Sequence, residues 1–303
     1  MGIKIGRLMI RTANTVVDFM VLTVILLLIA VAVYAIWDSG QVYQAADAAR
    51  YAPYKPSLQE DRVSFEELQD INPEVIGWLD VYGTSIDYPI TQGDDNAKYV
   101  NTNSFGDYSL SGAIFLDYLN SKNFNDFNSI LYGHHMEKQT MFGELASFGS
   151  KSFFDSHRYG MLYYDHQDHG LEFFAFIKTD AYDNSIFAPR IEGEEARQAY
   201  LQNLFDKAVF TRDIEVTTED HILVLTTCST ESTNGRDILA AKISDESFGN
   251  SFFAEETDKT NRQVSVDQQS SWEDLPMWLK IMLPVIVLML LVIAIYYRYR
   301  KRC

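Results

Sequence analysis

The sequence predicts a mainly β domain, a closed barrel or sandwich, held between two transmembrane helices. Short β-rich runs separated by turn residues begin at Val75, few helical patterns interrupt them, and a long apolar run lies near each end of the 303-residue chain. Such a series of short strands is typical of closed all-β folds. Eight strands are expected, at residues 75–81, 85–90, 113–116, 130–132, 161–164, 171–179, 222–227 and 238–243.

The first apolar run, residues 19–37, contains no charged residue. At about 1.5 Å per residue it is long enough to cross a hydrocarbon core of about 30 Å. Lys4, Arg7 and Arg11 precede it, and no A-x-A-like cleavage site follows it. We therefore expect an uncleaved signal anchor with residues 1–18 in the cytoplasm.

The second apolar run, residues 275–297, is followed by a basic tail at residues 298–303 that is also expected to stay in the cytoplasm. Both termini are then cytoplasmic, and residues 38–274 lie on the outer face of the plasma membrane. A basic tail after an apolar run could instead mark a surface protein that is cut and attached to a cell wall. Such a substrate needs an LPxTG-like pentapeptide at the outer end of the run, and the only Leu-Pro there is in Leu275-Pro276-Met277-Trp278, which does not match. We interpret the run as a second anchor.

The net charge of the chain is −17, and the basic residues near its two ends leave the domain between them still more acidic. This argues against nucleic acid or anionic lipid as a partner of that domain. The acidic charge indicates a domain that stays soluble at a crowded surface, and it does not identify a substrate.

Between the membrane and the first strand, a short Ala-rich helix is expected over residues 41–51, within a stalk that covers residues 38–63. Pro53 and Pro56 interrupt it. Ser64-Phe-Glu-Glu67 matches a capping box and predicts a short helix that ends before Asn72-Pro73.

The folded domain is expected to cover residues 64–253, and residues 254–274 form a polar linker back to the membrane. Within the domain, apolar residues at helical spacing predict one helix from Glu194 to Ala208. This helix precedes the strand that leads to Cys228.

Cys228 is the only cysteine between the two apolar runs, and it ends the strand pattern Ile222-Leu-Val-Leu-Thr-Thr-Cys228. Cys303 lies on the reducing side of the membrane and cannot pair with it. A lone thiol on an oxidising face is either a buried, inert side chain or a nucleophile. Pattern alone favours the structural role by roughly two to one, and the oxidising compartment shifts the balance towards function.

A catalytic cysteine needs a histidine or a cationic neighbour, because a thiol with a pKa of about 8.5 is mostly protonated at neutral pH. Ile130-Leu-Tyr132-Gly133-His134 ends an apolar strand with a glycine, which would present His134 at a barrel rim, while His135 would point the other way. Arg236 follows Cys228 by eight residues, close enough for an antiparallel neighbour strand to bring both to one end of the sheet.

Both side chains also have ordinary roles, since strand-end histidines and arginines near turns are usually solvated. His166-x-x-His169 could form half of a metal site, although no cysteine or HExxH motif accompanies it.

Five stretches of the chain, in this order, resemble the class B sortases of Gram-positive bacteria, over about residues 64–245. They are Asn72-Pro-Glu-Val-Ile-Gly77-Trp78-Leu, Ile86-Asp87-Tyr88-Pro89-Ile90, Gly112-Ala-Ile-Phe115-Leu116-Asp117-Tyr118, Tyr132-Gly133-His134-His135-Met136 with Thr140-Met141-Phe142, and Leu225-Thr226-Thr227-Cys228 with Arg236. The resemblance implies a closed eight-stranded sortase-type β-barrel with N-terminal helices and the inserted helix between the sixth and seventh strands.

The resemblance also implies a cysteine transpeptidase that needs no cofactor or metal. In it Cys228 matches the nucleophile, His134 the general acid and base, and Arg236 the residue that stabilises the oxyanion or substrate, with Thr227 and Ser229 as further candidates for substrate contacts. Its partners would be surface proteins or pilins that carry a sorting motif, and an amine from a cell-wall precursor or a pilin lysine. The alternatives are a hydrolytic cysteine peptidase, which would use the same three residues, and a non-catalytic surface receptor, whose Cys228 would be buried.

The chain departs from the family pattern at two places. The usual TLxTC motif reads Val224-Leu225-Thr226-Thr227-Cys228, which loses the first threonine and keeps the one beside the cysteine. The second anchor is unusual for class B enzymes that attach haem-uptake proteins and resembles that of pilus-assembly sortases.

Overall fold

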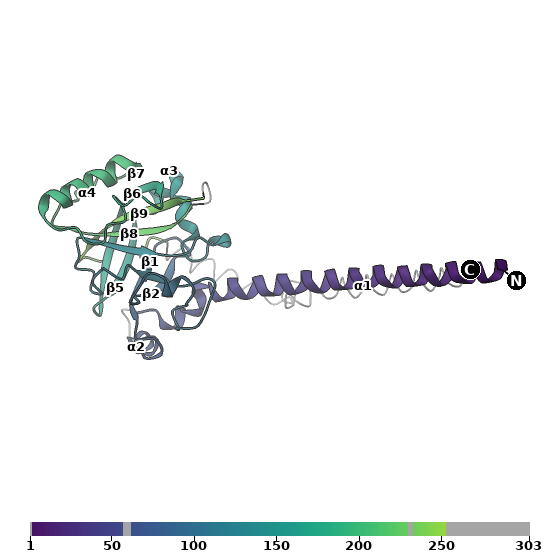
Figure 1. The fold of residues 1–303 in the computed structure, drawn as a ribbon. Coiled ribbons are helices and arrows are strands. Elements are labelled where there is room, and N and C mark those ends of the chain that lie inside the picture. The colour runs from purple at the N-terminus through teal and green to yellow at the C-terminus, as the bar shows by residue number, and fades with distance from the viewer. Residues whose placement is uncertain (1, 57–61, 230–232, 253–303) are drawn as a thin grey trace. The chain divides into compact units, whose positions relative to one another are not determined.

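The computed structural model describes residues 2–56, 62–229 and 233–252 (Figure 1). The described residues divide into two units, one that ends at residue 41 and another that begins at residue 42. The expected linker at residues 254–274, the second apolar run at 275–297 and the basic tail at 298–303 lie outside the described residues.

The N-terminal helix α1 spans Gly2–Ala45 and contains the whole apolar run. By length and composition, α1 is the one helix in the described part of the chain that could cross a membrane. The expected helix at residues 41–51 is not a separate element, because α1 continues to Ala45 and two short 3-10 helices follow, η1 (Ala48–Arg50) and η2 (Ala52–Tyr54).

The domain of the second unit is a β-barrel. Its strands among the described residues are β1 (Val75–Val81), β2 (Asp87–Thr91), β3 (Ile114–Leu116), β4 (Asn128–Tyr132), β5 (Tyr159–Tyr164), β6 (Gln167–Asp180), β7 (Ala208–Thr211), β8 (His221–Cys228) and β9 (Gly235–Ser244). They pair in the order β5-β1-β2-β3-β4-β8-β9-β6, and β6 pairs back with β5, so that eight strands close a ring. The predicted closed eight-stranded barrel is confirmed.

Strand β7 lies outside this ring, paired with the distal part of β6, and no pattern predicted it. Its four residues follow the preceding helix directly, with no turn residue between the two elements.

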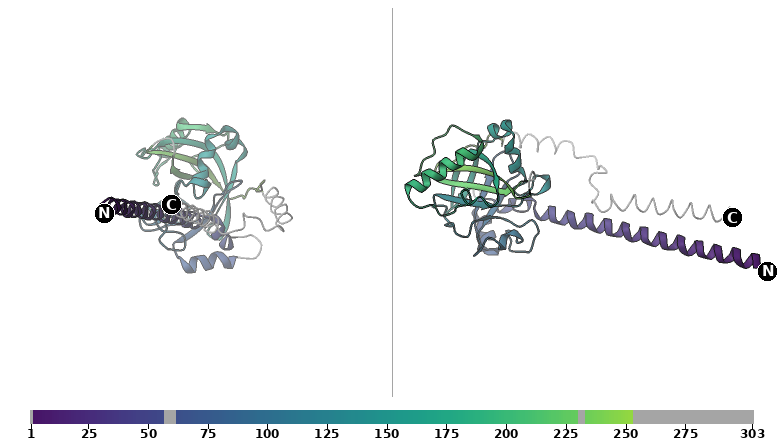
Figure 2. Two further views of the ribbon diagram at one scale, coloured as in Figure 1. Left: turned by 90° about the vertical axis from the view of Figure 1, so that its right-hand side faces the viewer. Right: turned by 45° about the horizontal axis from the view of Figure 1, so that its top comes forward.

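Alternation along the strands gives the barrel an inner and an outer apolar face. Leu223 and Leu225 of β8 belong to the large cluster that fills the barrel, whereas Ile222 and Val224 belong to a second cluster. Helix α4 (Glu194–Lys207), the expected inserted helix, contributes Tyr200, Leu201 and Leu204 to that second cluster. The right-hand view of Figure 2 shows α4 lying against the outside of the barrel.

The remaining helices are short and surround the barrel. They are α2 (Arg62–Ile71), η3 (Lys98–Val100), η4 (Glu137–Gln139), η5 (Gly143–Gly149) and α3 (Lys151–Ser156). Helix α2 begins two residues before the expected capping box.

The segment after α1 packs on the barrel instead of standing away from it as a stalk. Ala46 is 0% exposed and Tyr51 2% exposed, and both belong to the main apolar cluster. Tyr88 of β2 donates a hydrogen bond to the carbonyl oxygen of Ala46 at 2.8 Å.

Candidate active site

Strand register brings Cys228, His134 and Arg236 to one edge of the barrel. Strands β4 and β8 are parallel, with Tyr132 opposite Thr226, so the two chains leave the sheet at the same edge. His134 and Cys228 each lie two residues beyond that pair. Strand β9 runs antiparallel to β8, and its second residue, Arg236, is the register partner of Cys228. Two distant parts of the sequence, one with His134 and the other with Cys228 and Arg236, therefore meet at a single site.

Cys228 is exposed, and it is a free cysteine. It is the last residue of β8, after six consecutive buried residues. Its side chain shares the outer face of the strand with Thr226, since alternate residues point to the same side of a sheet. The structure therefore excludes the buried, inert thiol that pattern alone had favoured.

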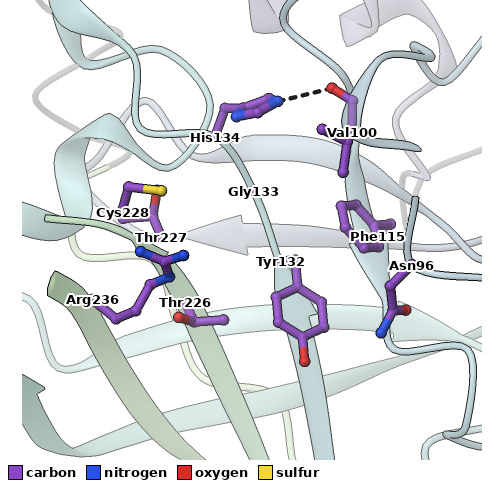
Figure 3. Close-up of a pocket in the computed structure, with 10 residues that line it drawn as sticks. All are labelled: Asn96, Val100, Phe115, Tyr132, Gly133, His134, Thr226, Thr227, Cys228 and Arg236. Carbon is purple, nitrogen blue, oxygen red and sulfur yellow. Dashed lines mark hydrogen bonds between the residues drawn. The ribbon is translucent and has the colours of Figure 1, made fainter. Parts of the chain in front are cut away.

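His134 forms a hydrogen bond through Nε2 with the carbonyl oxygen of Val100 at 2.8 Å. A carbonyl oxygen only accepts, so Nε2 must carry the proton, and Nδ1 is the nitrogen whose protonation is left to change. Figure 3 shows the His134 ring and the Cys228 sulfur facing the same space, and the Arg236 guanidinium beside Thr227 and Cys228. Arg236 also donates through one guanidinium nitrogen to the carbonyl oxygen of Gly235 at 3.0 Å.

These side chains line a cavity of about 310 Å³. Its lining consists of Asn96, Val100, Phe115, Tyr132, Gly133, His134, Thr226, Thr227, Cys228 and Arg236. The rings of Phe115 and Tyr132 stack with their centroids 5.3 Å apart and form an apolar wall. The cavity thus offers a thiol, an imidazole and a guanidinium beside a surface suited to apolar side chains.

Behind this wall lies a buried carboxylate, Asp117, which is 4% exposed. It accepts hydrogen bonds from the hydroxyl of Tyr132 at 3.0 Å and from the amide nitrogen of Asn96 at 2.8 Å. Burial, and then the charge of Asp117, raise the pKa of Tyr132, so the phenol stays neutral and continues to donate. Asp117 thereby fixes two side chains of the cavity wall.

The two lesser candidates for substrate contact occupy different places. Thr227 lines the cavity, but its hydroxyl oxygen is inaccessible to solvent. Ser229 follows the strand, donates its backbone N–H to the carbonyl oxygen of Gly235 at 2.8 Å, and is not part of the cavity lining.

Sequence reasoning assigned no role to Asn96, Val100, Phe115 or Tyr132. Phe115 and Tyr132 stand in motifs that carried the family resemblance, and this signal could have identified them. Asn96 and Val100 lie in the long connection between β2 and β3, where no periodicity marks a site.

The His166-x-x-His169 pair does not form a metal site in the described residues, which contain no group of three or more metal-ligating side chains. His169 instead stacks on Tyr164, with ring centroids 4.0 Å apart.

Comparisons with known proteins identify similar chains. No family model matches the chain. Sortase B of Staphylococcus aureus is 35% identical over 187 residues, which are 60% of this chain and 75% of that protein.

Two solved structures of streptococcal sortases are similar to the barrel. Sortase B from the Type II pilus of Streptococcus pneumoniae has 48% identity and a TM-score of 0.54, over 60% of this chain and 99% of its own. A class B sortase of Streptococcus pyogenes involved in pilus biogenesis has 41% identity and a TM-score of 0.55, over 60% of this chain and 98% of its own. Because the chain is 35% identical to a sortase B and covers 75% of that protein, it belongs to the class B sortases.

Proposed function

We propose that this chain is a membrane-tethered cysteine transpeptidase that cleaves a C-terminal sorting motif and joins the new carboxyl end to an amine. The observation that carries the proposal is that an exposed cysteine, Cys228, lines one cavity together with His134 and Arg236. Arg236 is also the register partner of Cys228 on the neighbouring strand. Helix α1 would hold the enzyme in the plasma membrane, with both termini in the cytoplasm and the catalytic domain outside.

In the first half-reaction the Cys228 thiolate attacks the carbonyl carbon of the scissile peptide bond. Negative charge develops on the carbonyl oxygen, and the Arg236 guanidinium is placed to stabilise it. The carbon–nitrogen bond then breaks, and the leaving amine takes a proton from the His134 imidazolium. The products are a thioester on Cys228, a free amine and a neutral His134.

In the second half-reaction an incoming amine attacks the thioester. Neutral His134 accepts a proton from that amine, the carbon–sulfur bond breaks, and the Cys228 thiolate is restored beside an imidazolium. The hydrogen bond from Nε2 to the Val100 carbonyl suits both protonation states of His134, because only Nδ1 gains or loses a proton. The thioester conserves the energy of the cleaved amide, so the cycle needs no cofactor.

The acceptor is proposed to be a pilin lysine rather than a cell-wall cross-bridge. The pilus sortases of the two streptococci are 48% and 41% identical to this chain, whereas the staphylococcal enzyme is 35% identical. The substrates would then be pilins or other surface proteins that carry a sorting motif.

Analysis of products with and without amine tests the proposed reaction. Purified full-length enzyme is incubated with a sorting-motif peptide and increasing concentrations of a lysine-containing pilin peptide or triglycine, and products are quantified by mass spectrometry. We expect the ligated product to rise with amine at the expense of free acid. Release of free acid alone at every amine concentration would indicate a hydrolytic peptidase, and absence of cleavage for all sorting peptides would favour a receptor.

A further inference from the structure

His134 is held between two irregular loops. Residues 134–142 form the loop that carries it, and the N–H of Phe142 closes this loop by donating to the carbonyl oxygen of His134 at 3.0 Å. The second loop, residues 98–113, supplies the Val100 carbonyl that orients the ring. The position of the imidazole relative to Cys228 therefore depends on what holds these two loops.

The loop after His134 cannot hold its shape by local preference alone. Lys138, Gln139 and Met141 have φ angles of 60°, 62° and 53°, in the left-handed region that residues other than glycine rarely adopt. Such a conformation persists where surrounding contacts over-determine it.

One set of these contacts comes from the segment that leaves the membrane helix. The N–H of Met141 donates to the hydroxyl oxygen of Tyr88 at 3.0 Å, and that hydroxyl donates to the carbonyl oxygen of Ala46 at 2.8 Å. All three residues are at most 2% exposed. Burial raises the pKa of Tyr88 to about 12, so its hydroxyl remains protonated and the two hydrogen bonds persist across the physiological range.

The same segment contacts the His134 loop a second time, nearer the surface. The Tyr43 hydroxyl donates to the Glu137 carboxylate at 3.3 Å. The ammonium nitrogen of Lys138 lies 4.3 Å from the centroid of the Tyr43 ring. Tyr43 thus contacts two consecutive residues of the strained loop.

The loop that supplies Val100 also rests on this segment. The rings of Tyr51 and Phe105 stack with centroids 5.0 Å apart, and Tyr54 packs on the edge of Phe105 at 5.7 Å. Both loops around His134 are therefore supported by the stretch Tyr43–Tyr54, which consists of the last three residues of α1 and the residues that follow up to the end of η2.

We propose that the segment Tyr43–Tyr54 positions His134 for catalysis, with Tyr88 as the residue that connects the segment to the histidine loop. Tyr88 is a positioning residue, since it is not among the residues that line the cavity. The proposal rests on the proposed role of His134 in proton transfer. If the proposal holds, the segment that connects the barrel to the membrane anchor also keeps the catalytic histidine in place.

Tyr88→Phe in the full-length enzyme tests the proposal, because it removes the hydroxyl and keeps the ring. Tyr200→Phe is the matched control: Tyr200 is also buried and donates to a backbone carbonyl, that of Ile186 at 2.9 Å, but it lies on α4. Three quantities are measured for each variant, namely kcat and KM for peptide cleavage, the rate of Cys228 alkylation by iodoacetamide, and the thermal midpoint. Peptide mapping separates Cys228 from Cys303.

We expect Tyr88→Phe to lower kcat about tenfold, because small displacements of a catalytic group are costly, while KM stays within about twofold of wild type. Alkylation of Cys228 should also slow, since a displaced imidazolium stabilises the thiolate less well. Tyr200→Phe should change neither rate, even where its thermal midpoint falls as far as that of Tyr88→Phe. Tyr43→Ala, a change outside the core, should also lower kcat, by a smaller factor than Tyr88→Phe. If Tyr88→Phe does not fold, the kcat of Tyr43→Ala tests the positioning role instead.

Equal kcat and alkylation rates for Tyr88→Phe and Tyr200→Phe would overturn the proposal, whether both are unchanged or both fall together. His134→Ala separates this failure from failure of the proposed function. An active His134→Ala enzyme contradicts the proton-transfer role itself, whereas an inactive His134→Ala with wild-type Tyr88→Phe contradicts the positioning role alone.

Discussion

His134 and His135 are neighbours in the chain, yet the structure gives them different surroundings. His134 lines the cavity, while Nδ1 of His135 is buried with no hydrogen-bond partner among the described residues. We predict that His134→Ala loses most activity and that His135→Ala keeps a substantial fraction. Steady-state rates of the two variants measure this, and equal losses would show that the choice between the neighbours is wrong.

Arg236 lies opposite Cys228 and faces the same cavity. Lysine would keep the charge but lose the planar pair of donors that can hold a carbonyl oxygen and a neighbouring group together. We predict that Arg236→Lys lowers kcat/KM by more than about tenfold, or about 1.4 kcal/mol of transition-state stabilisation. A value of kcat/KM near wild type would mean that Arg236 acts only as a distant charge.

At the residue scale, the sequence was informative where a strand pattern ended in a reactive side chain. Cys228 and His134 each follow a run of buried residues, so their position at a barrel edge could be inferred. Val100 could not be found in this way, because it contributes its backbone carbonyl, which every residue has. Its importance comes only from the fold of the connection between β2 and β3.

At the scale of elements, alternating and apolar runs located all eight strands of the barrel and the helix α4. The connection after α1 is predicted as a stalk because its Ala-rich helical pattern is broken by Pro53 and Pro56. Burial of Ala46 and Tyr51 depends on the surface that the barrel offers, which local pattern does not encode.

One carboxylate, Asp183, connects the end of α4 to strand β6 through hydrogen bonds. It accepts hydrogen bonds from Lys207, at the end of α4, and from Thr179 of β6 at 2.7 Å. Although burial acts in the opposite direction, the hydrogen bonds from Lys207, Ser185 and Thr179 hold the pKa of Asp183 well below its usual range. The ionised carboxylate therefore stabilises the folded state.

We predict that Asp183→Asn lowers the free energy of unfolding by about 1–2 kcal/mol at pH 7, a charged hydrogen bond discounted for partial exposure. Because the pKa is depressed in the folded state, this stability is present above the unfolded pKa of about 3.9 and is lost as the pH falls towards the folded value. Urea unfolding at pH 7 and below pH 4 measures the difference from wild type. Asp206→Asn, on the exposed side of α4, is the control. If the difference in free energy of unfolding between wild type and Asp183→Asn is as large below pH 4 as at pH 7, the account is contradicted.

At the scale of the whole molecule, the basic residues around the apolar runs predict a chain with both termini on the cytoplasmic side of the membrane. The described residues include the first of these runs as part of α1. The second run, residues 275–297, remains a prediction. If it orients the site towards a membrane-held pilin, then a chain that ends at Ser271 should cleave peptide in solution as fast as the full-length enzyme. Attachment of a tagged substrate in cells should fall, because the effective concentration of the two membrane-bound reactants is reduced. Cell-surface attachment at matched expression measures this effect, and equal attachment would show that the second anchor is dispensable.

The central claim is that Cys228 carries the acyl group between the two half-reactions. Intact mass spectrometry of the full-length enzyme, incubated with a sorting-motif peptide in the absence of amine, tests it most directly. We predict a thioester adduct in wild type and in Cys303→Ala, with a mass gain equal to that of the free N-terminal peptide fragment less one water. We predict no adduct and no cleavage in Cys228→Ala, whose thermal midpoint should remain near wild type because an exposed side chain is removed. An adduct on Cys228→Ala, or cleavage of the peptide by that variant, would contradict the account.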